Sequence, residues 1–124
     1  MKAAVIVFSD PKSGSEESLG RLFNALAAAY DFKQRGEDVQ ILFQGAGTRW
    51  AGELMNTQHP AYELFAAVKD KVAGVSCGCA DVFGAQAGVA ASGFDLITEN
   101  SVPNTTGLPS LARLTAEGYA ILTF

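Results

Sequence analysis

Few residues of this chain have types and spacings that could do chemistry, and foremost among them are its two cysteines. Cys77 and Cys79 lie two positions apart in the stretch VSCGCAD. Two neighbouring thiols can bind a metal, exchange electrons as a disulfide or carry sulfur as a persulfide. They can also be passive, because a free cysteine behaves as a small apolar residue of the core.

The sequence argues against the metal and disulfide readings. A closed metal site takes about four ligands, and besides the thiols the chain has one histidine, His59, with no Cys-x-x-Cys spacing. A Cys77–Cys79 disulfide would close a small, strained ring, although Gly78 eases it. No metal is therefore predicted. Two interpretations remain: one of the thiols carries sulfur, or both cysteines are passive residues of the core.

The elements that must position these thiols alternate along the chain. A continuous apolar run at 3–8 predicts a strand buried on both faces, and the segments 39–43, 73–76 and 119–124 predict further strands, while 94–97 is a short strand or an anchored turn. Apolar periodicity predicts helices over about 16–35, after Pro60, over about 81–92 and from near Pro109. Ser13 and Glu16 have the spacing of a capping box for the first helix. The pattern predicts an α/β fold, a single domain over 1–124 with a parallel sheet of about five strands and helices on both faces.

In such sheets ligands gather outside the carboxyl ends of the strands. Three loops are expected there, at 9–15, 44–50 and 77–80, so the thiols should lie between a strand end and a helix N-terminus, where N–H groups stabilise a thiolate. Asp81 opposes that effect. The candidate ligand-binding residues come from the middle loop and are Gln44, Gly45, Arg49 and Trp50. Arg49 would balance the charge of a bound anion, and Trp50 would form a side of the crevice.

Charge and hydropathy exclude several classes of partner. The formal net charge is −4 and no basic run occurs, which argues against nucleic-acid binding. The apolar run near the N-terminus is six residues long, too short to cross a membrane, so we expect a soluble, cytoplasmic protein without a membrane partner. The loop at 9–15 lacks the tight pattern with which flavodoxins hold a flavin phosphate, which disfavours a flavoprotein.

Several segments carry a family resemblance. The opening AAVIVFSDP, the long first helix, the turn FQGAG, the stretch CGCADVFGA and the closing GYAIL make the chain similar to the DsrE/DsrF-like family of small sulfur-relay proteins along essentially its whole length. The resemblance implies one DsrE-like domain over 1–124 with flavodoxin-like topology. It also implies no flavin or other cofactor, and a homo-oligomer such as a trimer or hexamer.

The resemblance further implies a role for the thiols. In active relay members a cysteine after a central strand accepts sulfur as a persulfide from a donor protein and passes it to an acceptor protein. CADVFGA matches the family's second cysteine at Cys79, whereas the strand-end position favours Cys77. We predict Cys77 as the sulfur carrier, with Cys79 as a resolving or supporting thiol. The alternative is a non-catalytic oligomeric module that binds a small ligand or a protein and whose cysteines are passive.

Overall fold

The computed structural model describes all residues, 1–124, and contains a single five-stranded sheet. Its strands are β1 (Lys2–Val7), β2 (Asp38–Phe43), β3 (Val72–Ser76), β4 (Leu96–Ile97) and β5 (Tyr119–Thr123). All neighbouring strands pair in parallel, in the order β4-β3-β2-β1-β5. The predicted α/β class, with one parallel sheet of five strands, is confirmed.

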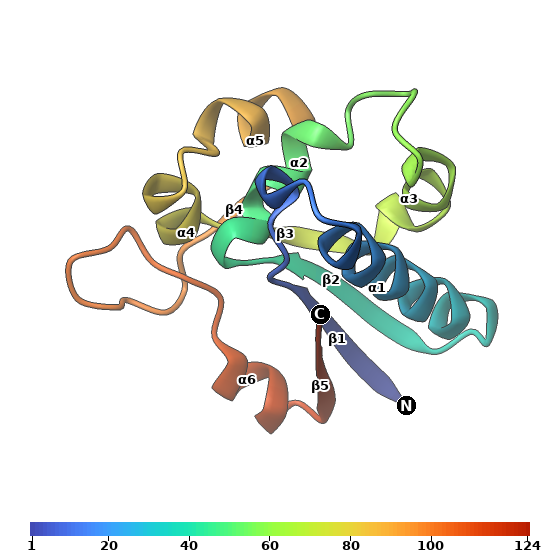
Figure 1. Cartoon of the computed structure of the whole chain (residues 1–124). Coiled ribbons are helices and arrows are strands. Elements are labelled where there is room, and N and C mark those ends of the chain that lie inside the picture. The colour runs from blue at the N-terminus through green and yellow to red at the C-terminus, as the bar shows by residue number, and fades with distance from the viewer.

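Six helices and three short 3-10 turns connect these strands (Figure 1). The helices are α1 (Glu16–Gln34), α2 (Trp50–Glu53), α3 (Tyr62–Val68), α4 (Cys77–Val82), α5 (Gln86–Ser92) and α6 (Leu111–Ala116). The turns are η1 (Pro11–Ser13), η2 (Gly45–Arg49) and η3 (Lys69–Lys71). None of the helices is both long enough and apolar enough to cross a membrane.

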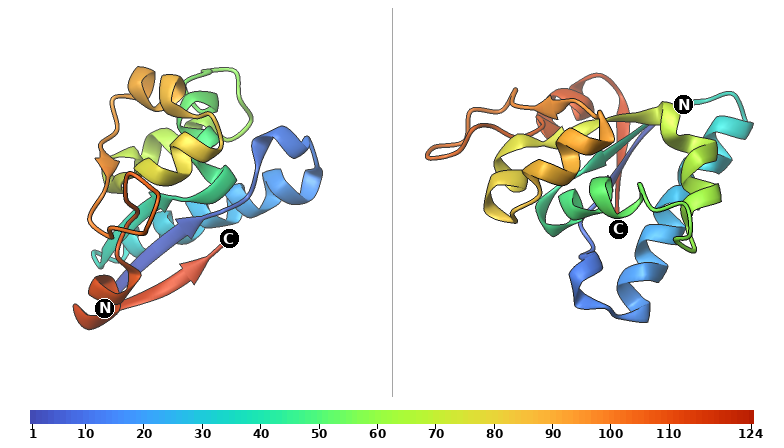
Figure 2. Two further views of the ribbon diagram at one scale, coloured as in Figure 1. Left: turned by 90° about the vertical axis from the view of Figure 1, so that its left-hand side faces the viewer. Right: turned by 90° about the horizontal axis from the view of Figure 1, so that it is seen from above.

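The strand order explains why one helix stands apart from the others. From β1 to β4 the chain moves across the sheet in one direction, and β5 then returns to the far edge beside β1. Because parallel crossovers are right-handed, reversing the direction moves the connecting helix to the opposite face. Accordingly, α1 and α3 cover one face and α6 lies on the other (Figures 1 and 2). The long return segment after β4 docks on the start of α4, at the carboxyl end of β3, before it reaches α6 (Figure 1).

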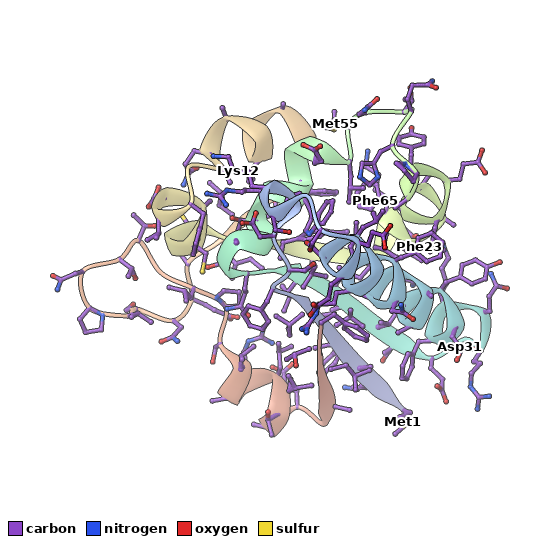
Figure 3. All side chains as sticks on the ribbon, viewed as in Figure 1. Met1, Lys12, Phe23, Asp31, Met55 and Phe65 are labelled. Atoms are coloured by element: carbon purple, nitrogen blue, oxygen red, sulfur yellow. The ribbon has the colours of Figure 1, made fainter.

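The two faces of the sheet have unequal cores. The larger core joins inward residues of β1 and β2, such as Val5 and Phe43, to α1, α3 and the region around Trp50. Phe65 of α3 is one of its buried residues and is labelled in Figure 3. The smaller core lies under α6 and consists of Ala4, Ile6, Leu42 and Leu114. The central strands β1 and β2 therefore bury both of their sides over most of their length, as a parallel sheet requires.

Two local expectations differ from the structure. The segment predicted as one helix over about 81–92 is split, because Gly84 adopts a left-handed conformation with φ of 66° and Ala85 N–H donates to the carbonyl of Ala80. At the start of α1 the N-cap is Ser15, whose side chain accepts from the N–H of Ser18, and not Ser13. Ser13 instead supports the cap through its contact with the Ser15 hydroxyl.

Candidate functional site

Cys77 is the first residue of α4 and follows directly on β3. The turn is fixed by Ser76, whose side chain accepts a hydrogen bond of 3.3 Å from the N–H of Cys79. Both thiols are free and partly buried. Residues two apart on a helix point in directions about 200° apart, so the two side chains do not face each other. The role of Cys79 stays a prediction.

A hydrogen-bond network surrounds the sulfur of Cys77. The hydroxyl of Thr106 lies 3.1 Å from Cys77 Sγ and 2.7 Å from Asp81 Oδ2. From α5, Gln86 Nε2 donates to Asp81 Oδ1 at 2.6 Å and lies 4.0 Å from Cys77 Sγ. The predicted sulfur atom thus lies among three polar side chains drawn from two helices and a distant loop. The sulfur does not lie within an apolar core.

Thr106 reaches Cys77 because the segment between β4 and α6 folds back on itself. Asn100 and Leu108 pair through two backbone hydrogen bonds and close the loop 101–107, which projects beside α4 (Figure 1). The second half of this loop is attached to α4 by a hydrogen bond of 2.7 Å, which the N–H of Gly78 donates to the carbonyl of Gly107. The glycine of the Cys-Gly-Cys stretch therefore provides the place where the loop docks.

A small open cleft runs between α4 and this loop. Its volume is about 310 Å³ and it is lined by Gly78, Asp81, Val82, Asn104, Thr105 and Thr106. Val82, which lines this cleft, is 73% exposed. Asp81 and Thr106, which contact each other next to Cys77, form part of its wall. The cleft offers an approach to the polar network, in a position that the sequence could not reveal.

Arg49 is predicted to balance the charge of an anion bound in the crevice. In the structure its guanidinium is paired with a carboxylate of the protein itself. Its Nη1 lies 3.0 Å from both carboxylate oxygens of Asp10, and its Nε donates to the carbonyl of Phe83 at 3.0 Å. The guanidinium also stacks over the Phe83 ring. Arg49 therefore joins the loop after β1 to the break between α4 and α5. This brings it beside α4 but leaves its charge neutralised by Asp10.

The other three candidates of the middle loop also lie at the carboxyl edge. Trp50 is buried in the larger core, where its indole N–H donates to the carbonyl of Ser9 at 2.8 Å. Gly45 adopts a φ of 56° that favours glycine. Gln44 is 5% exposed, and its Oε1 is buried without a hydrogen-bond partner. Of the four, Gln44 alone keeps an unused buried polar group.

The ion pair between Arg49 and Asp10 makes stability depend on pH. Desolvation raises the pKa of Asp10, but the hydrogen bond from Lys12 N–H and the contact with Arg49 outweigh it, so the pKa is lowered from its ordinary value. A carboxyl whose pKa is lowered by folding stabilises the fold above its unfolded-state pKa of about 4, and this contribution is lost as the pH falls through the folded-state pKa.

We therefore expect Asp10→Asn to lower the free energy of unfolding by roughly 1 kcal/mol at pH 7 and by much less at pH 3, since the pair is partly exposed. Urea unfolding at both pH values measures the difference. Glu17→Gln is the control, because its pair with Arg21 is an exposed i,i+4 contact on α1 and should count for little at either pH. An equal loss at pH 3 and pH 7 would contradict the prediction.

Sequence reasoning identified Cys77 and Asp81 but missed their partners. Gln86 lies on a helix whose start was not predicted, and Thr106 lies in a segment that the sequence identifies only as loop.

The structure brings no three His, Cys, Asp or Glu side chains together in a way that could hold a metal ion. A second polar cavity of about 400 Å³ lies between the ends of β1 and β5 and is lined by residues such as Ser9, Ser13 and Thr123.

Comparison with known proteins bears on these observations. The family model of the DsrE/DsrF-like family matches residues 1–124, the whole chain. An uncharacterized protein of Methanocaldococcus jannaschii, MJ0733, is 31% identical over 84 residues, which are 67% of this chain and 67% of that protein. No solved structure matches significantly. The parallel five-stranded sheet and the full-length match agree, and the chain belongs to the DsrE/DsrF-like family.

Proposed function

We propose that this protein is a cytoplasmic sulfur carrier that holds sulfane sulfur on Cys77 and relays it between a donor and an acceptor protein. The observation that carries the proposal is the position of Cys77, a free thiol at the carboxyl end of a central strand with hydrogen-bonding side chains at its sulfur. Membership of the DsrE/DsrF-like family supports a sulfur-relay-related role in general. The specific persulfide step is our inference.

In the first step the Cys77 thiolate attacks the terminal sulfur of a donor persulfide. A new S–S bond forms on Cys77, the S–S bond of the donor breaks, and the donor leaves as a thiolate. In the second step an acceptor thiolate attacks the terminal sulfur in turn and releases Cys77 as a thiolate. Neither step requires an external oxidant or reductant. Each step forms one S–S bond and breaks another, and it releases one thiolate for the thiolate that it consumes.

The polar partners of the bound sulfur come from Thr106 and Gln86, which already lie near Cys77 Sγ. Arg49 contributes indirectly to the site: it donates a hydrogen bond to the Phe83 carbonyl and so holds the end of the helix that begins at Cys77. The low charge content of 18% and the family resemblance support assembly into a homo-oligomer, such as a trimer or hexamer. Native mass spectrometry would report that assembly directly.

The proposal is tested by incubating the protein with polysulfide and then removing the excess. We expect the peptide that contains Cys77 to gain the mass of one or more sulfur atoms, and this gain to be reversed by a thiol reductant. Cys77→Ser should abolish the gain, whereas Cys79→Ser, a matched change two residues away on the same helix, should retain most of it.

Two outcomes would overturn the proposal. A Cys77 that stays unmodified under excess donor would favour the passive binding module. A gain that follows Cys79 instead of Cys77 would move the carrier to the other thiol. Peptide mapping distinguishes the two thiols if alkylation is done after unfolding.

A further inference from the structure

Thr106 has one hydroxyl hydrogen and two acceptors for it. Its Oγ1 lies 2.7 Å from Asp81 Oδ2 and 3.1 Å from Cys77 Sγ. A hydroxyl can donate only once, and a carboxylate oxygen is a stronger acceptor than a thiol sulfur. The hydrogen therefore points at Asp81, and a lone pair of the Thr106 oxygen faces the sulfur.

This arrangement favours one protonation state of Cys77. A thiol S–H can donate to the free lone pair of Thr106, so the chain from Cys77 through Thr106 to Asp81 is complete when Cys77 is neutral. A thiolate in the same place would face an oxygen lone pair and, behind it, a negative carboxylate. We propose that Asp81 restrains Cys77 as a neutral thiol by holding the hydroxyl hydrogen of Thr106.

Gln86 fixes the carboxylate in the orientation that this restraint requires. Its Nε2 donates to Asp81 Oδ1 at 2.6 Å and lies 3.4 Å from the carbonyl oxygen of Cys77. One carboxylate oxygen is therefore assigned to Gln86 and the other to Thr106. The same geometry determines what an asparagine at this position would do. Its oxygen would accept from Gln86, and its amide group would donate to Thr106 and turn the Thr106 hydrogen toward the sulfur.

The other charged groups around α4 are already paired. Arg49 from η2 pairs with Asp10 and donates to the Phe83 carbonyl. At the base of the loop, Glu99 pairs with Arg113 of α6. β3 contributes Ser76, α5 contributes the neutral Gln86, and α4 itself carries the second thiol, Cys79. Asp81 is therefore the charged group that is linked to the Cys77 sulfur through hydrogen bonds.

The inference deepens the proposed function and rests on it for its purpose. A thiol held neutral resists oxidation and stray electrophiles until a sulfur donor arrives. A donor can enter the cleft beside the exposed Val82 and form hydrogen bonds with Thr106 or Asp81 in place of the bond between them. The Thr106 hydroxyl hydrogen is then no longer held by Asp81, and the thiolate form of Cys77 is favoured. The restraint thus couples docking of the donor to activation of the sulfur-accepting group.

The test measures the rate at which iodoacetamide alkylates Cys77 at pH 7, in a Cys79→Ser background and without any sulfur donor. We expect Asp81→Asn to raise this rate about fivefold to tenfold and to move the midpoint of the pH–rate profile to lower pH. In a Thr106→Val background the increase should shrink to about twofold, the part that acts through space. Thr106→Ser keeps the hydroxyl and should preserve the full increase.

An Asp81→Asn variant that reacts at the original rate or more slowly would overturn the inference. So would an equal increase with and without the Thr106 hydroxyl, because Asp81 would then act only as a nearby charge. Both substituted side chains are exposed, and urea midpoints verify that the variants remain folded. Since no sulfur donor is present, a failed polysulfide test with an intact Asp81–Thr106 coupling would refute the carrier function alone.

Discussion

Gly47→Ala is expected to destabilise the protein by about 3 kcal/mol or more. A Cβ atom on Gly47 would overlap the carbonyl oxygen of Val7 and lie 2.8 Å from its carbonyl carbon. Both are backbone atoms at the end of β1, so no side-chain rotation relieves the overlap. Such a loss is a large fraction of the 5–15 kcal/mol typical of a domain.

The damage should spread to the candidate site, because η2 connects β2 to α2 and contacts α4 through Arg49. Urea unfolding followed by circular dichroism measures the loss. Gly20→Ala is the matched control: Gly20 lies within α1, a Cβ there meets nothing within 4 Å, and alanine should stabilise the helix by roughly 0.5–1 kcal/mol. If Gly47→Ala unfolds within 1 kcal/mol of the parent, the close packing of η2 on β1 is not essential.

The sheet could be predicted from the sequence because each strand carries its own signal. A strand buried on both faces needs an unbroken apolar run, which β1 has; β2 is interrupted only by the half-buried Gln40, and the apolar edge strand β5 stays partly exposed. The position of Cys77 followed from the same reasoning, since in a parallel sheet the residue after a strand lies at the edge where ligands gather. These are local features, and one segment of sequence is enough to read them.

The partners of Cys77 could not be predicted, because they depend on contacts between distant segments. Thr106 is separated from Cys77 by 29 residues, and it arrives there only because the chain returns across the sheet after β4. Nothing in the stretch NTTG distinguishes this threonine from any exposed loop residue. Arg49 shows the same limit, since its charge was placed at the correct edge but its pairing with Asp10 depends on how two loops meet.

Gly78→Ala is expected to raise the rate of Cys77 alkylation by about tenfold while changing global stability much less. A Cβ atom on Gly78 would lie 2.9 Å from Leu108 Cδ1, which a rotation of that side chain can relieve, and 3.1 Å from the Gly107 carbonyl oxygen, which must move away from α4 by a few tenths of an ångström and so weakens the docking of the loop 101–107. Overpacking of this kind costs about 1.5 kcal/mol, which corresponds to roughly a tenfold larger population of the displaced loop. Because the loop projects from the body, its displacement leaves the two cores in place.

The displaced loop takes Thr106 with it, which both uncovers the sulfur and ends the hydrogen bond to Asp81. Iodoacetamide kinetics at pH 7 in the Cys79→Ser background measure the rate, and Gly20→Ala in the same background should leave it unchanged. The effect of Asp81→Asn should also be reduced when Gly78→Ala is present, since the hydroxyl that couples the two groups has moved. An unchanged alkylation rate would mean that the loop neither covers nor restrains Cys77, and that the glycine between the two cysteines serves only the turn of α4.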